Sequence, residues 1–167
     1  DATLKSDKNK RFYKSIVQRK FIKNKQLQLQ LSDVNKYLQC ETARDFDFYS
    51  FLSNQVIECA SSYLFYKWYL KQRRFKSILS YCYYNNSTMA LFKAANELKI
   101  PTIEYQHSQV TSNHFAYSNW GNSIANSTTL FPSKIWVWRD SDVLFLKKEF
   151  SALPNIQILK GGNVFIS

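Results

Sequence analysis

The chain has only two histidines, and both follow one short apolar stretch. Residues 100–105 have the pattern of a buried strand, and Gln106, His107 and Ser108 come directly after it. An imidazole has an ordinary pKa close to neutral pH, so His107 could act as a general base or hydrogen-bond a developing charge. The structural alternative is a strand-end histidine that satisfies a loop carbonyl. The second histidine, His114, lies seven residues downstream.

Glu104 lies within the same predicted strand, two residues before Gln106. Burying an unpaired carboxylate is costly, so this side chain must face solvent or have a partner. Arg139 or a helix N-terminus could be that partner. After the strand, residues 107–133 form a connection far longer than the usual length of about 4–6 residues, which is typical of a functional or disordered loop.

Strand and helix patterns alternate around these residues. Such alternation predicts an α/β domain with a mostly parallel sheet, Rossmann-like and flanked by helices. Pro101 begins one strand, and the sequence Asp140-Ser141-Asp142 is expected to cap the last helix. The predicted strands are 77–84, 102–106, 134–138 and 156–159, and the predicted helices between them are 89–98 and 143–152.

Polar residues follow three of the predicted strands. In open α/β sheets, ligands bind beyond the carboxyl ends of the strands, so these residues are candidates for substrate contacts. The turn after the first strand also opens a helix, whose backbone N–H groups could receive a phosphate, although a plain N-cap is the alternative. The three polar sets are Tyr84-Asn85-Asn86-Ser87, Gln106-His107-Ser108 and Trp138-Arg139-Asp140, and Gly161-Gly162-Asn163 is a possible fourth.

The N-terminal part differs from the rest of the chain. Residues 1–44 are predicted to form a basic segment with an amphipathic helix at 11–23, and residues 45–167 to form the α/β domain. Residues 26–31 alternate Gln with Leu, which is the period of a half-buried strand, although both residue types also favour helices. A long helix is expected from about Asp45 to Arg74, with Asp45 or Asp47 as its N-cap.

The net charge of +11 is concentrated in the N-terminal segment and around residues 67–76. Such a surface favours nucleic acid, anionic lipid or phosphorylated substrates, or it is only a solvated face. The sequence has no nucleic-acid recognition motif and no metal-ligand spacing, so we expect neither nucleic acid nor a metal ion to bind. No apolar run approaches the ~18 residues of a membrane-spanning helix. The chain starts at Asp1 without Met and ends at Ser167 soon after a predicted strand, which suggests a piece of something longer.

Residues 96–117 combine several of these features in order: a helix end, Ile-Pro-Thr, a strand, Gln106-His107-Ser108, then His114 and Tyr117. This order resembles a pattern of bacterial surface-polysaccharide glycosyltransferases with the two-domain GT-B architecture. The likeness covers roughly residues 76–165. In that pattern Gly usually stands where this chain has Ser108, and Gly permits a positive φ or a close approach to a ligand.

The resemblance implies an acceptor-side domain that transfers a sugar from a nucleotide-sugar co-substrate, with no other cofactor, to a glycan or lipid-linked acceptor of the cell envelope. It implies a second GT-B domain, a cytoplasmic location and possible contact with an anionic membrane surface. A polyol-phosphate transferase and a non-catalytic glycan- or partner-binding half-domain are the alternatives. The candidate catalytic residues are His107 and Glu104, and the candidate substrate-binding residues are Asn85, Asn86, Ser87, Gln106, Ser108, His114, Tyr117 and Arg139.

Overall fold

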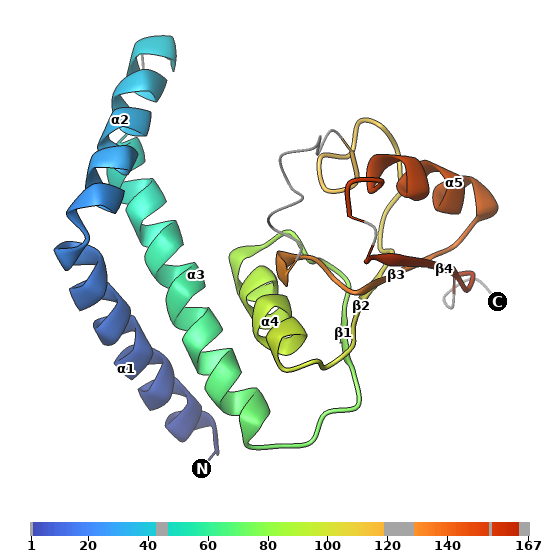
Figure 1. The fold of residues 1–167 in the computed structure, drawn as a ribbon, viewed down its shortest axis with the longest axis horizontal. Helices are drawn as coiled ribbons and strands as arrows, with labels where there is room; N and C mark the ends of the chain where they lie inside the picture. The colour runs from blue at the N-terminus through green and yellow to red at the C-terminus, as the bar shows by residue number, and fades with distance from the viewer. Residues whose placement is uncertain (1, 43–46, 119–128, 154, 164–167) are drawn as a thin grey trace. The chain divides into compact units, whose positions relative to one another are not determined.

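A computed structural model describes residues 2–42, 47–118, 129–153 and 155–163 (Figure 1). Contacts divide the chain into two compact units, Asp1–Tyr66 and Lys67–Ser167. This division lies beyond the boundary expected between residues 44 and 45. The reason is that residues of the third helix as far as Leu64 pack with the first two helices.

The first unit consists of helices. They are α1 (Ala2–Lys23), α2 (Lys25–Thr42) and α3 (Phe48–Lys71), of which the last continues into the second unit. The predicted helices at 11–23 and 45–74 are therefore confirmed, the first longer and the second shorter than expected. Asp47 caps α3, because its carboxylate accepts a hydrogen bond from the Ser50 backbone N–H at 2.9 Å. The pKa of Asp47 is lowered, first by a hydrogen bond with the Ser50 side chain and second by this backbone bond. Asp45, the other candidate cap, lies outside the described residues.

The predicted strand at 26–31 is wrong, because these residues belong to α2. Leu27 and Leu31 pack against a small cluster formed by Val17, Phe21 and Ile57, whereas Leu29 is 65% exposed. Residues four apart share one face of a helix, while in a strand all three leucines would share a face. Packing against α1 and α3 thus selects the helix from a pattern that suits both.

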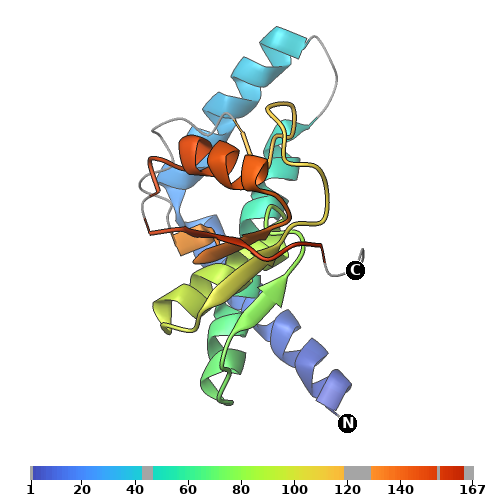
Figure 2. The same ribbon diagram turned by 90° about the vertical axis from the view of Figure 1, so that its right-hand side faces the viewer.

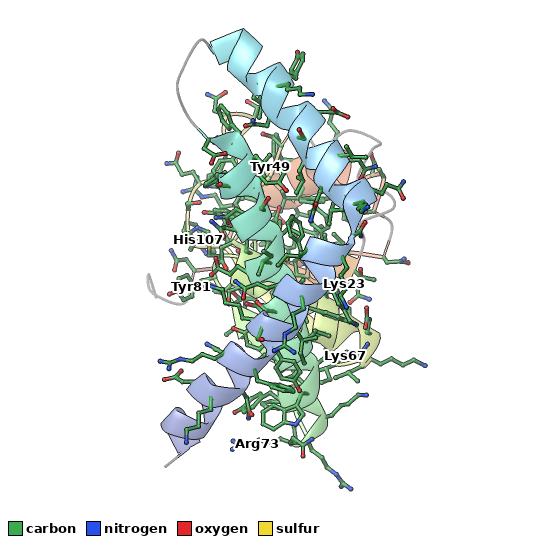
Figure 3. All side chains as sticks on the ribbon, turned by 90° about the vertical axis from the view of Figure 1, so that its left-hand side faces the viewer. Lys23, Tyr49, Lys67, Arg73, Tyr81 and His107 are labelled. Carbon is green, nitrogen blue, oxygen red and sulfur yellow. The ribbon has the colours of Figure 1, made fainter. Side chains whose placement is uncertain are left out.

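Helix α1 presents two chemically different faces. Val17 and Phe21 are buried against the rest of the unit, while the opposite face exposes Phe12 and Ile22. Basic side chains surround these exposed residues, among them Arg19 and Lys23, the latter labelled in Figure 3. Part of the positive charge therefore lies on a solvent-facing surface that also carries apolar groups. Within the described residues, none of the helices is both long and apolar enough to cross a membrane.

The second unit contains a four-stranded parallel sheet. The strands are β1 (Ile78–Ser80), β2 (Thr102–Tyr105), β3 (Lys134–Val137) and β4 (Gln157–Lys160), and they lie side by side in the order β1-β2-β3-β4. Helix α4 (Asn86–Glu97) contacts β2, and helix α5 (Asp140–Glu149) contacts β4 (Figures 1 and 2). The predicted α/β class with a parallel sheet flanked by helices is confirmed, and it is compatible with a Rossmann-like fold.

The core lies on the sheet face that carries Ile135 and Val137. Phe92 of α4 and Leu146 of α5 belong to the same buried cluster as these two strand residues, so both helices cover this face. Glu104 is aligned with Ile135 in the neighbouring strand and is fully buried with it. A carboxyl group thus lies inside a largely apolar core, which makes its partners important.

Several element boundaries differ from the predictions, and two of these changes matter most at the carboxyl edge of the sheet. Strand β1 ends at Ser80, because the Ser80 hydroxyl accepts a hydrogen bond from the Cys82 backbone N–H at 3.3 Å and the chain turns away. Tyr84 is therefore freed from the sheet. Helix α5 begins at Asp140 with Arg139 as its N-cap, and no side chain caps it. Asp140 and Asp142 form its first turn, where negative charge interacts favourably with the helix dipole.

Candidate active site at the carboxyl edge of the sheet

Gln106 is the residue that joins the ends of β2 and β3. Its side chain is buried, with Oε1 accepting a hydrogen bond from the Trp138 backbone N–H at 2.8 Å. Its Nε2 donates to the Ser108 carbonyl at 2.9 Å, and its own backbone N–H donates to the Trp136 carbonyl at 2.9 Å. These three bonds fix the start of the loop, so the neighbouring residue His107 emerges from a rigid position.

His107 lies on the β1 side of Gln106, among aromatic residues. Its Nε2 is 3.1 Å from the Tyr84 hydroxyl, and its Nδ1 is 3.7 Å from Glu104 Oε1. The ring centroids of His107 and Tyr81, both labelled in Figure 3, are 6.3 Å apart. The imidazole side chain is 27% exposed, so it contacts buried groups on one side and is open to solvent on the other. This is the exposure that a proton-transfer group needs.

Glu104 lies beneath His107 and is fully buried. The Tyr117 hydroxyl donates a long hydrogen bond of 3.5 Å to its Oε1, and Oε2 has no partner among the described residues. Burial raises the pKa of Glu104 to about 8, although hydrogen bonds from Tyr117 and from the Tyr83 backbone act in the opposite direction. Of the two expected alternatives, Glu104 does not face solvent but has a partner, and that partner is a buried tyrosine instead of Arg139.

The pKa of His107 is lowered, first by burial and second by the charge of the neighbouring His114. A carboxylate 3.7 Å away would normally raise it. Glu104 does not, because it holds its own proton up to about pH 8 and so carries no negative charge at neutral pH. His107 is consequently neutral near pH 7, and one of its ring nitrogens has a free lone pair.

His114 and Ser108 contact each other in the same cluster. The Ala116 backbone N–H donates to His114 Nδ1 at 3.3 Å, which leaves the hydrogen of the neutral ring on Nε2, 3.1 Å from the Ser108 hydroxyl. Among the described residues other than glycine, Lys99 is the one with a positive φ, so Ser108 has no left-handed backbone. Serine is therefore accommodated without the strain that replacing a left-handed glycine would cause, and its hydroxyl fixes His114.

The predicted N-cap at Asn85 is confirmed. Its Oδ1 accepts a hydrogen bond from the Thr88 backbone N–H at 2.9 Å, and its Nδ2 donates to the Cys82 carbonyl at 3.0 Å. Both ends of the amide are thus engaged locally. Asn86 and Ser87 form the first turn of α4 next to Tyr84, and their contacts with a substrate stay predictions.

A cavity of about 230 Å³ lies on the other side of Gln106, between the loop that follows β2 and the start of α5. We call it the Asp142 cavity. Arg139 lies here instead of in the histidine cluster. Besides Gln106 and Arg139, its lining includes Gln109, Thr111, Trp138 and Asp142.

Sequence reasoning found both histidines and placed Tyr84 and Trp138 among the polar strand ends, but it assigned neither of these two residues a role in a site. Tyr84 was expected inside a strand, where its hydroxyl would not have reached His107. Asp142 was expected to cap a helix, and Trp138 to end a strand. Aromatic and acidic residues at the ends of adjacent parallel strands were the available signal. In the part of the chain that is described, no set of three His, Cys, Asp or Glu side chains is arranged to hold a metal ion.

The arrangement combines a partly exposed neutral histidine, a buried protonated carboxyl group behind it and a separate polar cavity. Such a site is suited to moving a proton to or from a bound hydroxyl group. Comparison with protein families, curated proteins and solved structures finds no match to this chain, so its function is argued from this geometry.

Proposed function

We propose that the chain is a glycosyltransferase domain, one half of a GT-B enzyme, that transfers a sugar from a nucleotide-sugar donor to a cell-envelope polysaccharide or lipid-linked acceptor. The observation that carries this proposal is the position of His107. It stands at the carboxyl end of a central parallel strand, neutral and partly exposed, with its Nε2 already 3.1 Å from a hydroxyl oxygen. A general base for an acceptor hydroxyl needs this geometry.

In the proposed reaction, the Tyr84 hydroxyl marks the place that the acceptor hydroxyl takes beside Nε2. The acceptor oxygen forms a bond with the anomeric carbon while the bond from that carbon to the nucleotide phosphate breaks. The leaving phosphate keeps the bonding electrons, and the acceptor proton passes to His107 Nε2. Nδ1 meanwhile faces the protonated Glu104, with Oε1 3.7 Å away, so this side chain lies behind the ring on which the positive charge forms.

The remaining parts of the proposal concern groups outside this cluster. The second GT-B domain would supply most contacts to the nucleotide, and Arg139 and the first turn of α4 would contribute polar contacts to the substrates. The exposed basic face of α1, with Phe12 and Ile22, fits contact with an anionic membrane surface on the cytoplasmic side. A chain with this activity would need no cofactor other than its co-substrate.

The test is to measure turnover of His107→Ala and His107→Asn with a panel of nucleotide sugars and CDP-activated polyols. Proton transfer by a positioned base is worth about 10²–10⁴ in rate, so both variants should lose about that factor in kcat. Circular dichroism and thermal melting should show an unchanged fold, because the side chain is partly exposed. Retained turnover in the Asn variant, which keeps a polar group but no base, would contradict the role of His107.

The panel of donors also distinguishes the proposed glycosyltransferase from the two alternative functions. Turnover with CDP-polyols alone would identify a polyol-phosphate transferase on the same scaffold. A wild-type chain that binds glycans but turns over no donor, even with its second domain present, would be the non-catalytic half-domain.

A further inference from the structure

Two residues that line the Asp142 cavity each carry a buried polar atom without a hydrogen-bond partner among the described residues. Asp142 is 8% exposed, and its Oδ2 has no hydrogen-bond partner among the described residues. The same holds for the indole Nε1 of Trp138. Both residues line the cavity. Nearly all buried polar atoms in folded proteins are hydrogen-bonded, so an unmatched acceptor and an unmatched donor on two residues that line the same cavity require an explanation.

The chemistry of the two atoms limits what can satisfy them. A carboxylate oxygen needs a donor, whereas an indole N–H needs an acceptor. A phosphate would satisfy Trp138 but would face the Asp142 carboxylate. A cation would satisfy Asp142 but not Trp138, and Arg139 already brings positive charge to the lining. Hydroxyl groups satisfy both, because each hydroxyl donates one hydrogen bond and accepts others.

The rest of the lining matches a ligand with several hydroxyl groups. Gln109, Thr111 and Ser141 each add a side chain that can donate and accept. The N-terminus of the ten-residue helix α5 lies here without a side-chain cap, and its dipole favours oxygen acceptors. The cavity of about 230 Å³ is smaller than the sites of about 300–1,000 Å³ that hold drug-sized ligands, so it suits one ring.

We propose that the Asp142 cavity binds a single sugar unit of the acceptor, with Asp142 Oδ2 accepting from one hydroxyl and Trp138 Nε1 donating to another. This inference rests on the proposed transferase function for the identity of the ligand as acceptor. Gln106 lines the cavity and immediately precedes His107 in the chain. A sugar held there lies on the far side of Gln106 from the base, where it anchors the acceptor while another of its hydroxyls reacts.

The test uses the methyl glycosides of glucose, galactose, mannose and N-acetylglucosamine as probes. Binding to the full chain is followed by saturation-transfer NMR and by the indole N–H resonance of Trp138. At least one glycoside should give a saturable signal and shift that resonance. Shift of the resonance by inorganic phosphate alone, or the absence of saturable binding for every glycoside, would overturn the proposal.

Three variants locate the binding. Asp142→Asn and Trp138→Phe each remove one of the unmatched groups, and each should weaken glycoside binding about tenfold or more. Asp140→Asn is the matched control, because it makes the same change in the same helical turn at a side chain that is 78% exposed and paired with Lys160. It should leave binding unchanged. Equal weakening in Asp140→Asn and Asp142→Asn would overturn the proposal.

The readouts also distinguish this inference from the proposed function. His107→Asn should bind the glycosides as the wild type does while losing turnover. Normal transfer with no glycoside binding would overturn the sugar site and leave the role of His107 standing. Should Asp142→Asn fail to fold, Trp138→Phe carries the same test, because it keeps an aromatic ring while removing the N–H group.

Discussion

Glu104 and Asp142 are two buried carboxyl groups on opposite sides of Gln106, and their surroundings differ. Glu104 is enclosed by the core, receives a hydrogen bond from a buried tyrosine and keeps its proton to about pH 8. Asp142 borders a cavity at the first turn of a helix, where the backbone favours negative charge. In our proposals, the first environment supports proton transfer at His107, and the second leaves an acceptor for a ligand. The contrast shows that burial alone does not decide what a carboxyl group does.

The largest expected effect is on the pH dependence of the free energy of unfolding, and it tests whether Glu104 differs from Asp142. An unfolded Glu104, with an ordinary pKa of 4.5, is ionised above that pH, whereas the folded one keeps its proton to about pH 8. The folded state then binds more protons, so the free energy of unfolding should fall by about 1 kcal/mol per pH unit as the pH rises through this range. Glu104→Gln should remove this decline.

The clearest window is pH 6.5 to 8. Below it, His107 acts in the opposite sense, because its lowered pKa makes the folded state lose stability as the pH falls below 6.5. Urea unfolding at several pH values, followed by tryptophan fluorescence, measures the slope. Asp140→Asn is the control and should keep the wild-type slope, since Asp140 is exposed. An equal slope in Glu104→Gln and the wild type would mean that Glu104 does not keep its proton in the folded state, and the proposed difference from Asp142 would be wrong.

A smaller effect is expected at Ser108, which belongs to the histidine side of the comparison. Ser108→Ala removes the hydroxyl that contacts His114, with an expected loss of about 1 kcal/mol in the free energy of unfolding. Ser108→Gly should cost up to about 1 kcal/mol more, because glycine gains freedom in the unfolded chain. Thermal melting measures both. A glycine variant more stable than wild type would mean that the loop favours a left-handed backbone at this position.

The smallest effect is electrostatic and concerns the pair of histidines. The ring centroids of His107 and His114 are 6.5 Å apart, and the charge of His114 contributes to the lowered pKa of His107. His114→Asn should therefore raise the pKa of His107, while burial keeps it below the ordinary value of 6.5. NMR titration of the remaining imidazole measures this. Asp142→Asn should leave that titration unchanged, and a similar shift in both variants would mean that the two sides of Gln106 are coupled.

The sequence allowed the α/β class to be predicted because helix and strand periods alternate and are separated by Asn85, Pro101 and Asp140 at the boundaries. It also placed His107 at a strand end. It did not reveal that Tyr84 reaches His107, because a run of apolar residues does not show where a strand stops. The contact between Glu104 and Tyr117 was likewise hidden, since it depends on how a long loop returns to the sheet.

The N-terminal helices show a related difficulty. Alternating Gln and Leu in residues 26–31 suit a strand or a helix equally, and only the contacts of Leu27 and Leu31 with the neighbouring helices decide between them. At Asp142, the residue type was noticed but assigned to capping, because the start of α5 could not be placed to within three residues. Errors of a few residues in the predicted element boundaries therefore misplaced Tyr84 and Asp142, two of the side chains that build the site.

The packing at the end of β4 restricts which residues related proteins can have at two positions. The Trp136 indole donates a hydrogen bond to the Gly162 carbonyl at 3.0 Å, and any side chain at Gly161 would overlap the indole ring. Positions 136 and 161 must therefore vary together. Relatives that keep a tryptophan at the first position should keep a glycine at the second, and those with a larger residue at the second should have a smaller one at the first. Correlated substitution at these two positions would thus mark chains that share this packing of β3 against the end of β4.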